Sequence, residues 1–217
     1  MKFIWNHISD PERFFFSKTP VKIETLNDIN GDIYNYFRVI RENAAALAKQ
    51  IEMTPYSREE YEKCFKEISD DDDPIEQARK FAVRCWFGFG SSNVYKNGFR
   101  SSQSRRSPQT TKQWNVLPDR ILRSAERLKN AQIERLDAIE LIRRYDTPDV
   151  FIYLDPPYRK QRIHEILTLI DCNGLLKESG NVVCESLKED SFAESYGNLY
   201  QVKNVNYGIT KITYYKR

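Results

Sequence analysis

The stretch FIYLDPPYRK, residues 151–160, carries an apolar run directly into an acid, two prolines and an aromatic ring. Its first four residues are all aliphatic or aromatic, the pattern of a strand buried on both faces of a parallel sheet. Pro156 and Pro157 end this strand, because proline has no N–H to donate to a sheet ladder. Asp155 is therefore predicted at the carboxyl edge of the sheet, where open α/β sheets bind their ligands.

The residues after the strand form a receptor for a flat group that carries an amino substituent. Asp155 can accept hydrogen bonds from the amino group, the Pro156 carbonyl offers a second acceptor, and the Tyr158 ring can stack on the flat group. A proline-rich exit loop with a solvated aspartate is the alternative that these residues leave open.

Length and composition indicate a globular protein. The 217 residues suffice for one ordinary domain, or for one domain with a sizeable insertion. Hydrophobic residues make up 40% and charged residues 30%, and no apolar run reaches the roughly 20 residues of a membrane helix. The first ten residues lack the apolar core of a signal peptide, so we expect a cytoplasmic protein without membrane contact.

Cysteines, histidines and net charge exclude several classes of site. The four cysteines are widely spaced, which argues against a zinc site or a disulfide framework and fits reduced, packed thiols. His7 and His164 lie far apart, so no metal site is predicted, and both are expected at the surface or in packing. The net charge of +3 does not indicate a nucleic-acid partner, so such a partner must be inferred from local charge.

Periodicity predicts strands and helices in alternation, interrupted by a helical segment and closed by an antiparallel pair. This order favours an α/β fold, with a mostly parallel sheet and helices on its faces. Strands are expected within 21–31, 131–136, 150–154 and 181–186, with a terminal hairpin that turns near Gly208. A helix is expected from Ile33 to Ile40, and its apolar stripe continues through Leu47 and Ile51 into a second helical stretch. Further helices are expected at 57–68, 75–87, 139–143 and 163–170, and at 118–130, where Ile121, Leu122, Ala125 and Leu128 share one face. The run SDDDDP before residue 75 is expected to cap the helix that follows.

A basic segment without acids or periodicity runs from Asn93 to Gln113. We expect it to be a mobile loop that contacts phosphates, with a merely solvated surface loop as the alternative. Its cations are Lys96, Arg100, Arg105, Arg106 and Lys112.

Residues 18–158 resemble the D12 class of DNA adenine-N6 methyltransferases, the Dam-like enzymes carried by many phages and by restriction-modification systems. KTPVKIETLNDINGDIYNYFRVIREN is similar to that family's second strand and following helix, and KQWNVLPDRILRSAERLKNAQIERLDAIELI to the segment before the D-P-P-Y strand. The resemblance implies a Rossmann-like sheet, S-adenosylmethionine as methyl donor, and double-stranded DNA bound by a monomer or weak dimer. It further implies a methyltransferase domain at 1–49 and 116–217, and a target-recognition insertion at 50–115.

The same resemblance implies roles for individual residues. Asp155 and the carbonyl of Pro156 would hold the amino group of a flipped adenine, beside Pro157, and Tyr158 would stack on its ring. Cofactor binding would fall to Asp155 and to residues near the ends of two other strands, namely Asp28, Asn30 and Asp137. Asp28 would bind the ribose hydroxyls and Asp137 the cofactor's adenine amino group. A helix-capping role for Asp28, and a purely structural one for Asp137, stay open.

The chain departs from the D12 pattern in two places. The family's amino-terminal strand is expected to be missing, and its glycine-rich loop is replaced by DPERFFFSKTP, residues 10–20, which contain no glycine. CWFGFGSS, residues 85–92, is expected to be a turn in the insertion rather than a substitute for that loop. After the motif, the sequence looks more like bacterial small-subunit rRNA guanine-N2 methyltransferases. Three functions therefore stay open: DNA adenine methylation, rRNA guanine methylation, and DNA binding by an inactive remnant.

Overall fold

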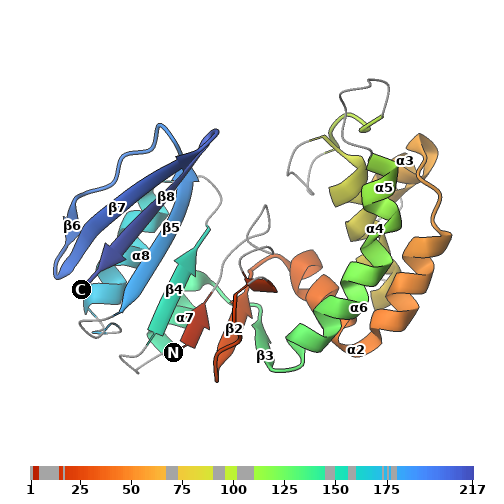
Figure 1. The fold of residues 1–217 in the computed structure, drawn as a ribbon. Coiled ribbons are helices and arrows are strands. Elements are labelled where there is room, and N and C mark those ends of the chain that lie inside the picture. Colours follow the sequence, from red (N-terminus) through yellow and green to blue (C-terminus); the bar gives the residue numbers. More distant parts are fainter. Residues whose placement is uncertain are drawn as a thin grey trace. The chain divides into compact units, whose positions relative to one another are not determined.

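The computed structural model describes residues 2–4, 15–16, 18–66, 73–89, 96–101, 110–144, 150–155, 160–172, 174, 176 and 180–217. The chain divides into two compact units (Figure 1). Unit 1 contains Met1–Ile29 and Asn130–Arg217, and unit 2 contains Asn30–Lys129.

Unit 1 is built on a twisted sheet with the strand order β1-β4-β5-β8-β7-β6. Strands β1, β4 and β5 are parallel, and β8, β7 and β6 follow as an antiparallel extension. A second parallel pair, β2 and β3, continues this arrangement, because β2 lies beside β1 (Figure 1). The strands are β1 (Lys2–Ile4), β2 (Glu24–Asn27), β3 (Ala131–Glu134), β4 (Val150–Leu154), β5 (Asn181–Leu187), β6 (Ser195–Tyr196), β7 (Leu199–Tyr207) and β8 (Thr210–Lys216).

Strand β1 corrects the expectation that an amino-terminal strand is missing. It pairs in parallel with β4, and Ile4 lies opposite Ile152 in the register. With only three residues, β1 is too short to display the alternation from which a strand can be recognised in a sequence. Its place in the sheet depends on pairing with a strand more than 140 positions away along the chain.

Helices α7 (Ala138–Arg144) and α8 (Lys160–Cys172) cover one face of this sheet (Figure 1). Their apolar side chains pack on alternate residues of β4 and β5, with Ile152 and Cys184 completely buried in one core. Because successive strand residues point to opposite faces, Tyr153 and Asp155 face away from these two helices. The predicted parallel strand at 150–154 and the predicted hairpin are confirmed, and Gly208 adopts φ +59° in the hairpin turn.

Unit 2 is helical. Helix α2 packs against α4 and α6, and its core includes Ile33, Leu47 and Phe81. A break in helical geometry at Asn43 divides α2, as expected from the two helical stretches in the sequence. The helices are α2 (Gly31–Met53), α3 (Arg58–Lys66), α4 (Pro74–Phe87), α5 (Thr110–Asn115) and α6 (Leu117–Leu128).

Local signals in unit 2 gave both right and wrong predictions. The predicted cap at the start of α4 is confirmed, since the Asp73 carboxylate accepts from the backbone N–H groups of Ile75 and Glu76 at 3.0 and 3.1 Å. Leu122, placed by its spacing on the buried face of α6, is instead 45% exposed. It follows Ile121 by about 100° around the helix, so only one of the two can face α2 fully.

The expected mobile loop is also wrong in part. Residues 110–115 form helix α5, and Phe99 makes an isolated β-bridge with Gly88. The ring of Phe99 packs on that of Tyr56, with centroids 5.3 Å apart. Aromatic packing thus fixes backbone that carries no periodic pattern. The predicted insertion at 50–115 lies within unit 2, which also includes the start of α2 and all of α6.

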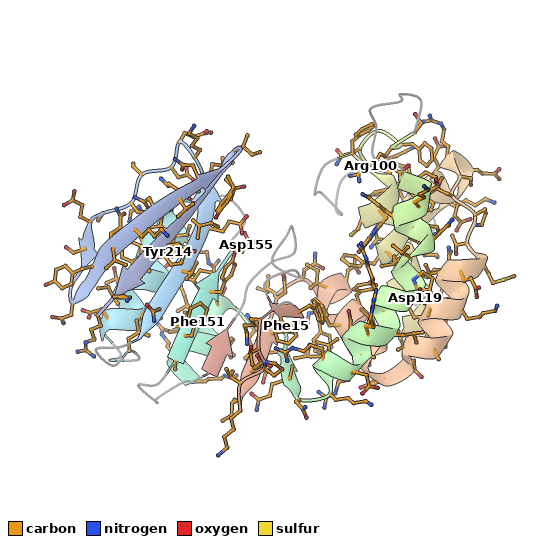
Figure 2. All side chains as sticks on the ribbon, in the orientation of Figure 1. Phe15, Arg100, Asp119, Phe151, Asp155 and Tyr214 are labelled. Carbon is orange, nitrogen blue, oxygen red and sulfur yellow. The ribbon has the colours of Figure 1, made fainter. Side chains whose placement is uncertain are left out.

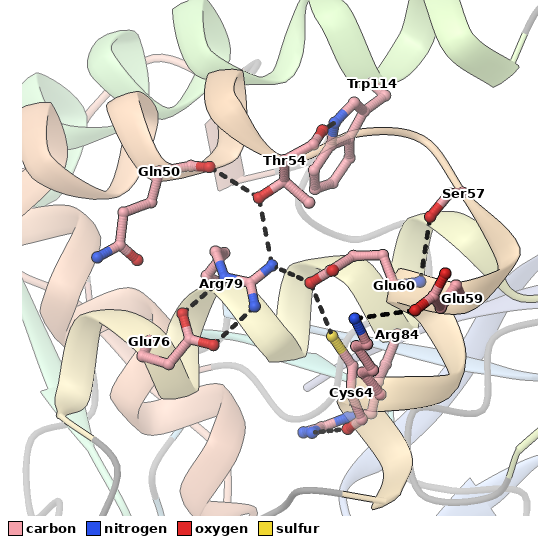
Figure 3. A network of polar contacts seen from close by, with 11 residues as sticks. Gln50, Thr54, Ser57, Glu59, Glu60, Cys64, Glu76, Arg79, Arg84 and Trp114 are labelled. Atoms are coloured by element: carbon pink, nitrogen blue, oxygen red, sulfur yellow. Dashed lines mark hydrogen bonds and ion pairs between the residues drawn. The ribbon is translucent and has the colours of Figure 1, made fainter.

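A polar network around Arg79 joins three parts of unit 2 (Figure 3). The Arg79 guanidinium donates two bonds to Glu76 at 2.6 Å, one to Glu60 on α3 at 2.6 Å, and one to the Thr54 hydroxyl at 3.2 Å. The pKa of Arg79 is raised, and the hydrogen bonds to Glu76 are the largest cause. Thr54 in turn accepts from the Trp114 indole at its carbonyl, 3.1 Å away. The network therefore fixes α3 and α5 to the end of α2.

None of the helices in the described part of the chain is long and apolar enough to cross a membrane.

Candidate active site at the strand ends

Asp155 stands directly after β4, at the carboxyl end of this parallel strand (Figure 2). Its side chain is buried, with the residue 3% exposed. This placement confirms the predicted position and excludes a solvated exit-loop aspartate. Pro156, Pro157 and Tyr158, the rest of the motif, lie outside the described residues.

A second acid, Glu185 on β5, lies next to Asp155. Leu154 pairs with Cys184 in the parallel register, so the following residues, Asp155 and Glu185, are neighbours across the two strands. Glu185 is 7% exposed, and its Oε2 accepts a hydrogen bond from the Tyr153 hydroxyl at 2.8 Å. Sequence analysis missed this residue, although an acid inside the apolar run NVVCES was a usable signal.

Tyr153 reports on the electrostatics of this edge. Burial raises its pKa, and the negative charges of Glu185 and then Asp155 add to the effect. Tyr214, on β8, contributes in the same direction, so the four side chains share one poorly solvated region. Figure 2 shows Asp155 at the end of β4 and Tyr214 on β8, with β5 between their strands.

Asp28 follows β2 and is 7% exposed. Its backbone N–H donates to the carbonyl of Glu134 at 3.3 Å and so continues the pairing of β2 with β3. The alternative that Asp28 caps the next helix is wrong, because Asn30 is the cap of α2 and accepts from the Asp32 N–H at 2.9 Å. A buried carboxylate at the end of the second strand fits the ribose hydroxyls of a nucleoside cofactor.

Asn27, the last residue of β2, is a functional candidate that sequence analysis did not single out. Its side-chain amide donates to the Leu136 carbonyl and accepts from the Leu136 N–H, both at 2.9 Å. The side chain is buried, with Asn27 4% exposed. Asn27 therefore holds the turn between β3 and α7, one residue before Asp137.

Asp137 begins α7. One carboxylate oxygen accepts from the Ile139 N–H at 2.9 Å, and the other forms an ion pair with Arg162 of α8. The carboxylate thus already has a structural role in joining two helices on the same face of the sheet. Its predicted contact with the cofactor's adenine stays a prediction.

The basic residues predicted to bind DNA have different surroundings in unit 2. Lys96 forms an ion pair with Glu62 of α3 at 3.6 Å, so the acid-free segment meets an acid from elsewhere in the chain. Arg100 is held through its backbone, whose N–H donates to the Phe87 carbonyl at 2.7 Å. Lys112 is exposed on α5. Arg105 and Arg106 lie outside the described residues.

Gly88, the first glycine of CWFGFGSS, follows the last residue of α4 and is closely packed. A Cβ at this position would lie 3.0 Å from both the Arg84 carbonyl and the Tyr61 hydroxyl. A side chain at this position would therefore crowd both groups inside unit 2. The turn expected at 85–92 is wrong in part, because Cys85–Phe87 belong to α4 and Gly88 is extended at its end, and residues 90–92 lie outside the described residues. Of the segment that replaces the glycine-rich loop, the described residues include Phe15, which is completely buried, and Lys18, which pairs with Glu24.

Cys64 and Cys184 are buried, Cys85 is half-buried and Cys172 is exposed. The four thiols are free, and burial raises the pKa of Cys64 to about 12. The Nδ1 atom of His164 bonds to the Tyr196 hydroxyl, and its ring packs near Phe192. His7 lies outside the described residues. Among the residues that the structure describes, no group of three His, Cys, Asp or Glu side chains could hold a metal ion.

A parallel sheet closed by an antiparallel hairpin, with acids at the carboxyl ends of its strands, is an α/β architecture that binds its ligands at these strand ends. The chain belongs to the D12 class of N6 adenine-specific DNA methyltransferases, whose family model matches residues 13–214. It is also 35% identical over 99 residues to the Bacillus subtilis protein named "Putative rRNA methyltransferase YlbH", a match that covers 44% of this chain. The chain spans about half of that relative's length, 54%.

Two solved structures also match parts of this chain. A Streptococcus pyogenes protein described as conserved hypothetical is 27% identical, with a TM-score of 0.40, over 49% of this chain and 66% of its own. The Escherichia coli protein titled "Putative methyltransferase yhhF" is 12% identical, with a TM-score of 0.48, over 99% of this chain and 75% of its own.

Proposed function

We propose that this methyltransferase acts on the N6 amino group of an adenine in double-stranded DNA, with S-adenosylmethionine as the methyl donor. The observation that carries the proposal is the position of Asp155. The acid of the D-P-P-Y motif stands buried at the carboxyl end of a parallel strand, within the residues that the D12 family model matches.

The chain's contribution to the reaction is the positioning of the amine. The Asp155 carboxylate accepts one amino hydrogen and the Pro156 carbonyl accepts the other, which turns the nitrogen lone pair toward the methyl donor. Tyr158 stacks on the flipped base, an interaction worth about 1–3 kcal/mol. The bound donor supplies an electrophilic methyl group, so no covalent intermediate with the protein is required.

The strand ends on the other side of β1 would hold the cofactor. Asp28 binds the ribose hydroxyls, supported by its burial at the end of β2. Asp137 accepts from the cofactor's adenine amino group, and Asn27 keeps the Asp137 turn in place through its two bonds to Leu136. Asn30 belongs to the same group through its position after β2 and contributes the cap of α2.

The basic residues of the insertion would neutralise DNA phosphates. Lys112, exposed on α5, is the described cation best suited to this role. Each phosphate contact contributes about −0.9 to the slope of log affinity against log salt concentration. Lys112→Ala should therefore reduce the slope for duplex DNA by about one unit on all sequences alike. An unchanged slope would remove Lys112 from the interface.

Ribosomal RNA is the second candidate substrate, favoured by the name of the Bacillus subtilis relative, an rRNA methyltransferase. The resemblance of the sequence after the D-P-P-Y motif implies guanine N2 as the target in that RNA. Both targets are exocyclic amines on a purine, so one site geometry serves either reaction. The third candidate is an inactive DNA-binding remnant, favoured by the absence of glycine from residues 10–20.

One experiment separates the three candidates. Protein and radioactive S-adenosylmethionine are incubated with duplex DNA or with ribosomal RNA, and the modified nucleosides are identified by mass spectrometry. N6-methyladenine in DNA supports the proposal, N2-methylguanine in RNA replaces it with the second candidate, and DNA binding with no calorimetric binding of the donor supports the third. Asp155→Ala should abolish transfer and leave DNA affinity nearly unchanged, since phosphate contacts supply most of that affinity.

A further inference from the structure

Two carboxylates, rather than one, stand at the edge of the sheet where the D-P-P-Y motif begins. Asp155 and Glu185 occupy equivalent positions on the adjacent parallel strands β4 and β5, whose spacing is about 4.8 Å. They are 3% and 7% exposed, respectively. Buried acids are rare without a structural or chemical reason, because removing a charge from water is costly.

Both carboxylates lie on the same face of the sheet. Tyr153 and Asp155 are two residues apart on one side of β4, and the Tyr153 hydroxyl reaches Glu185 Oε2 at 2.8 Å. Tyr214 of β8, whose partner in the register is Val183, also raises the pKa of Tyr153, and the Lys203 ammonium of β7 lies 5.9 Å from the centre of the Tyr214 ring.

Methylation of an amine releases one proton, and this proton needs an acceptor. The amine nitrogen uses its lone pair to bond the methyl carbon, while the carbon–sulfur electron pair leaves with the donor's sulfur as a neutral thioether. The nitrogen is then positively charged, and the loss of one N–H proton restores a neutral amine. A second negative charge near this nitrogen stabilises the charge that develops on it during transfer.

We propose that Glu185 is the second acid of this site: its charge stabilises the positive charge that arrives on the amine nitrogen, and it receives the released proton from Asp155. This inference rests on the proposed methyl transfer to an exocyclic amine and applies equally to adenine and guanine. Tyr153 holds the Glu185 carboxylate by donating to Oε2. Glu185 therefore acts through Asp155, which contacts the amine.

Two substitutions separate the charge of Glu185 from its contact with Tyr153. Glu185→Gln removes the charge but keeps a side-chain oxygen that can accept from the Tyr153 hydroxyl. Tyr153→Phe removes the hydroxyl and keeps the carboxylate. Glu189→Gln is the matched control, because Glu189 is exposed in the turn that follows the same strand.

The first test is single-turnover methyl transfer at saturating donor and nucleic acid. Glu185→Gln should lower the rate by about 10²-fold or more, within the usual range for a lost proton acceptor, and leave donor affinity unchanged. The acid limb of the pH–rate profile should flatten from a two-proton to a one-proton dependence, since two adjacent acids titrate as a pair. Tyr153→Phe should lose less, and Glu189→Gln should match the parent.

The second test needs neither donor nor nucleic acid. Urea unfolding at neutral pH is compared for Asp155→Asn, Glu185→Gln and the double variant. Adjacent carboxylates interact, so the midpoint shift of the double variant should differ from the sum of the single shifts. Glu185→Asp replaces Glu185→Gln if the latter does not fold.

The outcomes distinguish this inference from the proposed function. A parent protein that methylates neither DNA nor RNA overturns the proposed function, and the role of Glu185 with it. A parent that methylates, together with a Glu185→Gln variant of equal rate and additive unfolding midpoints, overturns the role of Glu185 alone. An equal loss in Glu185→Gln and Tyr153→Phe, with an unchanged pH profile, assigns Glu185 a structural role and also overturns the inference.

Discussion

Replacing Asn27 with alanine tests whether one buried amide holds the β3–α7 turn. The change removes two hydrogen bonds of 2.9 Å that join β2 to Leu136, 109 positions further along the chain. Each contributes about 1 kcal/mol net, and the backbone groups of Leu136 lose their partners. Because Leu136 is only partly buried, water can replace part of this loss. We expect unfolding to become easier by about 2 kcal/mol.

The exchange rate of the Leu136 backbone amide measures this loss of stability at a single position. A loss of about 2 kcal/mol corresponds to roughly 30-fold faster exchange of the Leu136 N–H, if exchange follows local opening. Asn206→Ala is the matched control, since Asn206 is exposed on β7 and should change stability by less than about 0.5 kcal/mol. A Leu136 amide with parental protection in Asn27→Ala would refute the reasoning.

Three further predictions concern stability. Arg79→Lys should lower the free energy of unfolding in urea by about 2–3 kcal/mol, because lysine cannot reproduce the fork of bonds to two glutamates. Lys49→Ala, in an exposed ion pair, should lower it by less than about 1 kcal/mol. Equal losses in the two variants would contradict the role of the Arg79 network. Burial raises the pKa of Cys64 to about 12 in the folded protein, so the buried thiol stabilises the fold fully below about pH 9 and this stabilisation falls by about 1.4 kcal/mol per pH unit above it. Cys64→Ala should therefore make the free energy of unfolding depend less on pH between about pH 9 and 11. The same pH dependence in the variant and the parent would contradict the burial of this thiol. Gly208→Ala should lower the thermal unfolding midpoint, because alanine at φ +59° adds about 1 kcal/mol of backbone strain. Gly208→Asn should lower the midpoint less, because asparagine tolerates this left-handed conformation. Equal midpoints for the two variants would contradict a left-handed residue in this turn.

Sequence analysis predicted the elements whose signals are local. The run before Asp155 has the composition of a buried strand, two prolines mark its end, and the structure has β4 there. Asp73 caps the amino-terminal end of α4, and Pro74 is its first helical residue, so the start of this helix is encoded by adjacent residues. The terminal hairpin follows from two β-rich runs around Gly208. In each case, the residues that decide the structure are neighbours along the chain.

The missed features depend on partners that are distant in sequence. Strand β1 has three residues and exists through its pairing with β4. Asn27 looks like one member of a polar turn until its partner Leu136 is known. Glu185 gains its interest from the parallel register that places it beside Asp155. Helical spacing assigned Leu122 to a buried face, and packing of α6 on α2 selected its neighbour Ile121 instead.

The helical unit leaves the sheet after β2 and returns at β3, and these two strands are hydrogen-bonded neighbours. Inside the unit, the Arg41 guanidinium on α2 donates to the carbonyl of Lys129, where α6 ends, at 3.4 Å. An excursion whose ends are already together adds little to the entropy of closing the sheet, and that cost grows only slowly with length. Evolution can therefore lengthen, shorten or exchange this unit while the strand register, and the acids at the strand ends, stay unchanged. The helical unit and the sheet can in this way change independently within one chain.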